Sequence, residues 1–111
     1  MSNLLIAKLI SRQPERDIQQ AICQVLTLHG WFCLEYGQPG GHDGLRGSVP
    51  PGHPDIIAWK AGRGLLLEVK SAIGFLSTAQ RHMHRMLGAS GVTVHTVRSV
   101  KEALEAANEQ E

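Results

Sequence analysis

The spacing of apolar residues in the first third of the chain is that of a helix. From Ile18 to Val25 they recur at intervals of three and four residues, which places them on one helix face. Pro14 is favoured at the first position of a helix and Gly30 just past its end, so we expect the helix between them. Short apolar runs then predict strands over 31–36, 55–59 and 65–70. A glycine-bearing turn over 60–64 joins the last two strands into a β-hairpin.

Two further helix starts are visible in the second half of the chain. Ser77 and Gln80 stand three residues apart, as in a capping box, and predict the start of a second helix. The alternating β-branched residues of 92–97 predict a strand. Ser99 and Glu102 form a second capping box and predict a final helix. The expected order is helix, strand, strand, strand, helix, strand, helix, which is typical of an α/β sandwich whose mixed sheet is flanked by helices.

The length of 111 residues indicates one domain, over 1–111. The apolar stretch 1–13 lacks the features of a signal peptide, and we expect it to form an N-terminal arm. The stretch 37–54 holds six glycines and four prolines, which predicts a long loop of functional importance. No apolar run reaches the ~18 residues of a membrane helix. Cys23 and Cys33 show no CxxC spacing, and we expect both to be buried and reduced in a cytoplasmic protein.

Composition and charge limit the classes of partner that the chain is expected to bind. Hydrophobic residues make up 42% of the chain, enough for a core, whereas aromatic residues make up only 5%, too few for a platform of stacked bases. The net charge of +1 does not by itself indicate nucleic-acid binding. However, no Asp or Glu occurs over 71–101, which contains Arg81 and Arg85. One face is therefore expected to be locally basic.

Two charged residues lie in a strand that is otherwise apolar. Side chains alternate along 65–70, so Glu68 and Lys70 share one face while Leu67 lies on the other. A strand this apolar is typically buried on both faces, where a charge costs several kcal/mol unless it is paired or bound to a metal. A strand end that reaches solvent would accommodate the two charges equally well.

A third charge, Asp55, opens the preceding strand directly after Gly-His-Pro. By itself it is an ordinary turn residue. The hairpin, however, would bring Asp55 opposite Glu68, and two close carboxylates repel each other unless a divalent cation lies between them. Together with the carbonyl of Val69 they would offer oxygen ligands suited to Mg²⁺ or Mn²⁺. Lys70 would then face the same site and could hold the attacking water.

These residues resemble a known family. Pro54-Asp55 followed by Glu68-Val69-Lys70 resembles the PD-(D/E)XK nuclease superfamily, which has a restriction-endonuclease-like α-β-β-β-α-β core. Four further segments resemble the VRR-Nuc branch: Glu15-Arg16-Asp17-Ile18-Gln19, Gly52-His53-Pro54-Asp55, Ile73 to Ser77 with Gln80, and Val97-Arg98-Ser99. The resemblance covers roughly 15–105, and the loop over 37–52 is longer and richer in glycine than in a minimal member.

The resemblance implies a Mg²⁺-dependent, structure-selective DNA endonuclease that acts on branched duplexes such as four-way junctions, as a homodimer and without a small-molecule cofactor. Mn²⁺ is expected to substitute for Mg²⁺. The implied catalytic residues are Glu15, Asp55, Glu68, Lys70 and Gln80, and the metal ligands are Asp55, Glu68, the Val69 carbonyl and Glu15, the last directly or through water. Glu15 also suits the helix dipole in a first turn, and Gln80 suits the capping box. We expect that one position of the Gln80 side chain cannot serve both the cap and the site.

Candidate DNA contacts are Arg46, His53, Arg81 and Arg85, each of which is also explained as a solvated surface group. Two other functions remain open at this point. One is a sequence-specific or a flap- and nick-directed nuclease. The other is a non-catalytic DNA-binding module on the same fold.

Overall fold

The computed structural model describes residues 14–36 and 50–110 of the chain. Their elements are α2 (Glu15–Leu28), β1 (Phe32–Glu35), β2 (Ile56–Lys60), β3 (Arg63–Val69), α3 (Thr78–Ala89), β4 (Val94–Val97) and α4 (Val100–Gln110). This order confirms the predicted succession of helices and strands. The arm expected over 1–13, and the part of the predicted loop over 37–49 that contains Arg46, lie outside the described residues.

The described strands form one mixed sheet in the order β1-β2-β3-β4. The pairs β1–β2 and β2–β3 are antiparallel, and β3–β4 is parallel. The turn of the β2–β3 hairpin is shorter than the predicted 60–64, because Ala61 and Gly62 alone form it, with φ of 52° and 80°. Two consecutive residues with positive φ allow a two-residue turn, so the strands pair up to Lys60 and Arg63.

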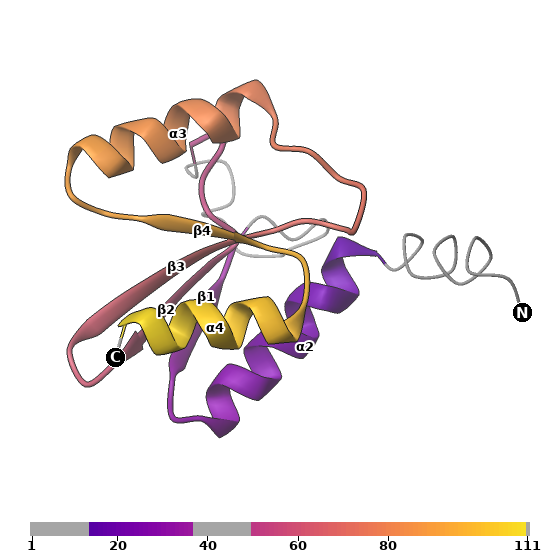
Figure 1. Cartoon of the computed structure of the whole chain (residues 1–111), viewed down its shortest axis with the longest axis vertical. Coiled ribbons are helices and arrows are strands. Elements are labelled where there is room, and N and C mark those ends of the chain that lie inside the picture. The colour runs from indigo at the N-terminus through magenta and orange to yellow at the C-terminus, as the bar shows by residue number, and fades with distance from the viewer. Residues whose placement is uncertain (1–13, 37–49, 111) are drawn as a thin grey trace, which may run out of the picture.

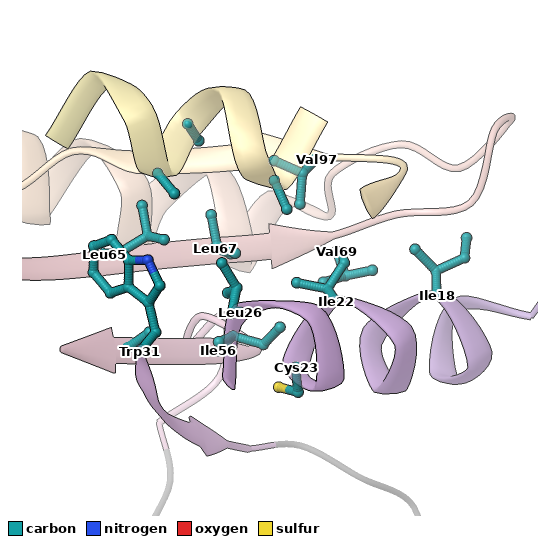
Figure 2. Packing of buried hydrophobic residues seen from close by; sticks show 14 residues of the cluster. Ile18, Ile22, Cys23, Leu26, Trp31, Ile56, Leu65, Leu67, Val69 and Val97 are labelled. Atoms are coloured by element: carbon teal, nitrogen blue, oxygen red, sulfur yellow. The ribbon is translucent and has the colours of Figure 1, made fainter. Parts of the chain in front are cut away.

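The hydrophobic core lies on one face of the sheet, under α2 and α4. Leu65, Leu67 and Val69 of β3 point into it, as their alternation predicts, and Figure 2 shows them beside Ile22 and Leu26 of α2. The remaining described helix, α3, lies on the other side of the sheet from α4 (Figure 1). The molecule therefore has three layers, and Glu68 points toward the layer formed by α3 because its neighbours in β3 face the core.

The helix ends follow their sequence signals with two differences. Pro14 is the N-cap of α2, not its first helical residue, because its extended backbone precedes the first turn. Ser77 and Gln80 form the complete predicted capping box. The box predicted at Ser99 and Glu102 is altered: the N–H of Glu102 donates to Ser99 Oγ at 3.1 Å, but the Glu102 carboxylate accepts from the N–H of Arg98.

The face of the sheet opposite the core is only partly covered. Phe32 pairs with Trp59 on this face, and the two residues are 65% and 49% exposed. Leu34, on the same face of β1, is 37% exposed. We call Phe32, Leu34 and Trp59 the open sheet face.

Two other expectations can be compared with the described residues. Cys23 is buried and unpaired, whereas Cys33, expected to be buried as well, is only half-buried because it lies on the edge strand β1. Among the helices of 14–36 and 50–110, none has the length and apolar character needed to cross a membrane.

Candidate active site

Asp55 and Glu68 meet where β2 begins and β3 ends. Ile56 is paired with Leu67, so the preceding residue of β2 comes next to the following residue of β3. Asp55 Oδ2 accepts a hydrogen bond of 2.8 Å from the N–H of Val69. This bond ties the start of one strand to the end of the other, and the side chains of Asp55 and Glu68 also interact with each other.

The Glu68 carboxylate is completely buried between the sheet and α3, with 0% exposure. Its Oε2 accepts from Gln80 Nε2 at 3.2 Å, and its Oε1 lies 3.2 Å from His84 Nε2. Burial, together with a hydrogen bond to Asp55 and the like charge of Asp55, raises the pKa of Glu68 to about 9. The sequence also allowed Glu68 to reach solvent at the end of the strand. This alternative is wrong, because Glu68 is completely buried.

Lys70 is also buried, at 8% exposure, one residue beyond the end of β3. Its Nζ lies 4.0 Å from Oε1 of Glu15, the first residue of α2. A Cβ atom at Gly74 would lie 3.3 Å from that same oxygen and 3.5 Å from Lys70 Cδ. The loop after β3 thus passes directly over the Lys70–Glu15 pair. Because glycine has no Cβ, Gly74 does not crowd the two side chains.

Gln80 serves the capping box and the site at the same time. Its Oε1 accepts from the N–H of Ser77 at 2.8 Å while its Nε2 donates to Glu68 at 3.2 Å. The expectation that one side-chain position cannot do both was therefore wrong. The two ends of the amide are different groups, an acceptor and a donor, and each faces its own partner.

His84 belongs to the site and was missed as a site residue from the sequence. It lies one helical turn after Gln80, on the same side of α3, so the i, i+4 spacing could have found it. Burial lowers the pKa of His84, and the charge of Lys70 lowers it as well, against the opposing effect of Asp55. The lowered pKa favours the neutral form of the ring beside Glu68.

Arg98 is the second residue that was missed. Its Nη1 donates to the carbonyl oxygens of Ser71 and Gly74, at 2.5 and 2.7 Å. These two bonds hold the loop that covers Lys70 and Glu15. The sequence marked Arg98 only as part of a strand end, because its partners lie more than twenty residues earlier in the chain.

The candidate DNA contacts differ in their surroundings. His53 Nδ1 lies 2.7 Å from the carbonyl oxygen of Pro54, and its ring packs on Tyr36 with 4.6 Å between centroids. Because a carbonyl accepts, Nδ1 carries the proton, and the ring supports the loop next to Asp55. Arg81 and Arg85 are exposed on α3, one helical turn apart.

The loop before Asp55 also rests on α3. Gly52 has a φ of +83°, and a Cβ there would clash with the carbonyl of Ala79. Glycine is therefore required at this position both for the backbone conformation and for the close approach. The contact seats the Gly-His-Pro-Asp segment against the first turn of α3, beside Gln80.

The donor set fits a hard divalent cation. Within the described ranges no group of three or more His, Cys, Asp and Glu side chains is arranged as a metal site. The residues that do converge are the carboxylates of Asp55 and Glu68, next to the main chain of Val69. Hard oxygen donors of this kind suit Mg²⁺, which usually keeps several waters and takes only one or two carboxylates.

The comparisons with known families and with curated proteins find no relative of this chain. No model of a known protein family matches the sequence, and no curated protein matches it.

Proposed function

We propose that the protein is a Mg²⁺-dependent DNA endonuclease of the VRR-Nuc branch of the PD-(D/E)XK nucleases, with their restriction-endonuclease-like core. Its substrate is branched duplex DNA, such as a four-way junction. The observation that carries the proposal is the completely buried Glu68 carboxylate beside Asp55, with Lys70 two residues further along the same chain segment. A buried carboxylate next to a second one destabilises the fold unless a cation or a proton balances their repulsion.

The residues divide the work of phosphodiester hydrolysis. Bound Mg²⁺ supplies neutralisation of phosphate charge and a lowered pKa for water. Asp55 and Glu68 would hold the ion with the carbonyl of Val69, and Gln80 orients the Glu68 carboxylate through its 3.2 Å bond. A water attacks the phosphorus, the bond to the 3′ oxygen breaks, and that oxygen takes a proton, so the product carries a 5′-phosphate.

Lys70 has the role of electrostatic stabilisation. Its ammonium group orients the attacking water and balances the negative charge that grows on the phosphate in the transition state. Glu15, 4.0 Å from Lys70 Nζ, directs the ammonium group and would be a further ligand of bound Mg²⁺, directly or through water. His84 is a positioning residue, because it contacts Glu68 and not the substrate.

DNA reaches this site over α3. Arg81 and Arg85 are exposed on that helix, and its stretch of the chain, 71–101, carries no acidic residue. Two arginines one turn apart suit successive phosphates of a DNA backbone. His53 supports the neighbouring loop, and Arg46 is a further candidate contact.

The enzyme acts as a homodimer, so that two symmetric strands of a junction are cut. The open sheet face suits a second copy because it is apolar and exposed, and it can meet an identical face across a twofold axis. Aromatic side chains carry about 150–250 Å² of surface each. Phe32 and Trp59 thus form the apolar centre of an interface that needs about 800 Å² per partner.

The decisive experiment compares cleavage of a four-way junction, a flap, a nicked duplex and a linear duplex, with and without Mg²⁺. The wild type is run beside Glu68→Gln, which keeps the shape of the buried side chain, and Glu105→Gln, which removes an exposed carboxylate on α4 as a control. We expect Mg²⁺-dependent cutting of the junction that only Glu68→Gln abolishes.

Other outcomes separate the rival functions. Preferred cutting of flaps or nicks, or of one linear sequence, would assign the protein to the corresponding nuclease class. Tight binding of DNA by the wild type without cleavage under any metal would instead identify a non-catalytic DNA-binding module.

A further inference from the structure

Two apolar side chains project from the loop that covers the candidate active site. Ile73 is 67% exposed and Phe75 is 81% exposed. They flank Gly74, the residue that passes over Glu15 and Lys70. In a chain with only 5% aromatic residues, an aromatic ring in solvent beside the candidate active site requires an explanation.

The loop is held in place by bonds at both of its ends. Arg98 binds the carbonyls of Ser71 and Gly74, and the N–H of Gly74 donates to the Ser71 carbonyl at 3.2 Å. On the other side of Phe75, Ser77 is locked into the capping box of α3. An anchored loop presents its apolar side chains in a defined direction, so binding to them costs little ordering.

The surroundings of Phe75 favour a nucleic acid as the occupant. Neither the loop nor α3 contains an Asp or a Glu; the nearby carboxylates belong to other elements beneath them. Arg81 and Arg85 add positive charge on α3. An aromatic ring stacks on any base whose face is uncovered, and apolar side chains are used as wedges between base steps. At a branch point, base pairs end and such faces are available.

We propose that Phe75, supported by Ile73, is a wedge that stacks on an unstacked base at the branch point of the DNA. The wedge rests on the proposed function and deepens it, because it names how a branched substrate is told from a linear one. Phe75 follows Gly74, which lies against Lys70 and Glu15, so a base stacked on Phe75 stands beside the candidate active site. A continuous duplex offers no open base face and gains nothing from the wedge.

The test uses Phe75→Ala and, as matched control, Leu28→Ala. Leu28 is 85% exposed and lies at the far end of α2 from Glu15, about 20 Å away along the helix axis. Cleavage rates at low substrate concentration are measured on a four-way junction and on a linear duplex of the same sequence. Loss of one stacked base lowers the junction rate by about ten- to a hundredfold and leaves the linear rate unchanged. Leu28→Ala should change neither.

A second readout does not need cleavage. With 2-aminopurine at the branch point, binding of the wild type without Mg²⁺ should change the fluorescence, and Phe75→Ala should not reproduce the change. The same probe placed ten base pairs into one arm is the control. This separates the two proposals. A fluorescence change without any cleavage would contradict the nuclease activity but support the wedge.

Three results overturn the wedge. One is an unchanged ratio of junction to linear cleavage in Phe75→Ala. Another is that the wild type binds no DNA at all or binds the junction with no branch-point fluorescence change. The third is a loss of self-association in Phe75→Ala, seen by sedimentation, with DNA cleavage intact, which would assign the loop to a protein contact.

Discussion

The carboxylate of Glu68 lies 3.2 Å from the ring nitrogen Nε2 of His84, in the layer between the sheet and α3. None of the residues of α3 is fully buried, and two of its side chains, Gln80 and His84, contact Glu68. The same carboxylate therefore serves the packing of α3 and the candidate metal site. The predictions below separate these two contributions.

Replacing His84 should weaken both the packing of α3 and the candidate metal site. In His84→Ala, Oε1 of Glu68 loses its partner inside the protein, which costs about 1–3 kcal/mol in the free energy of unfolding. We expect junction cleavage to fall as well, with kcat affected more than KM because the ring does not touch the substrate. His82→Ala is the control, since His82 is exposed on the same helix. Equal effects in the two variants, by urea unfolding and kinetics, would disprove the positioning role.

Stability without a metal should depend on pH through Glu68. Its pKa is raised from about 4.5 to about 9 by burial and by Asp55, so the folded state holds a proton that the unfolded state has released between these values. The contribution is complete below the lower value and is lost as pH rises toward the upper one. We expect urea unfolding in EDTA to show stability falling by a few kcal/mol from pH 5 to pH 9. Glu68→Gln should remove most of this slope, and an unchanged slope would contradict it.

Mg²⁺ should stabilise the fold through the same pair of carboxylates. At a concentration ten times its dissociation constant, a ligand of the folded state adds about 1.4 kcal/mol. We expect this gain at pH 8 in the wild type and in Glu105→Gln, but not in Asp55→Asn or Glu68→Gln. Thermal unfolding with and without Mg²⁺ measures it. A shift that persists in both site variants would place the ion elsewhere.

Gly74→Ala should impair activity and leave the fold intact. The added Cβ would lie 3.1 Å from Ser71 Oγ and 3.3 Å from Glu15 Oε1, so it displaces the carboxylate that faces Lys70. We expect cleavage to fall about tenfold while stability changes by less than about 1 kcal/mol. The control is Gly88→Ala in α3, where a Cβ meets nothing within 4 Å and should add up to about 1 kcal/mol of stability. Full activity in Gly74→Ala would mean that Glu15 has no part in cleavage.

The proposed dimer depends on the open sheet face. Trp59→Glu places a charge at the centre of that face, where 49% of the tryptophan is exposed in one copy. We expect sedimentation to show a monomer for this variant and a dimer for the wild type. Leu28→Ala, away from the face, should remain a dimer. If the wild type is a monomer and stays monomeric on branched DNA, paired cutting of two strands by a dimer is excluded.

The sequence by itself determined the order of the elements and the orientation of the key strand. The alternation of Leu67, Glu68 and Val69 decides which side chain faces the core, because successive residues of a strand point to opposite faces. The capping box of Ser77 and Gln80 is equally local. Asp55 could be placed opposite Glu68 because a hairpin pairs neighbours in the chain. These are relationships over a few residues, where spacing and geometry suffice.

Only the tertiary structure decided how α3 and the loops close around that strand. The contact of His84 with Glu68, and the reach of Gln80 to two partners at once, depend on the separation of the helix from the sheet. Arg98 finds the carbonyls of Ser71 and Gly74 because β4 returns parallel to β3 after an entire helix. Such distances are the sum of many packing contacts, and no local pattern of residues encodes them.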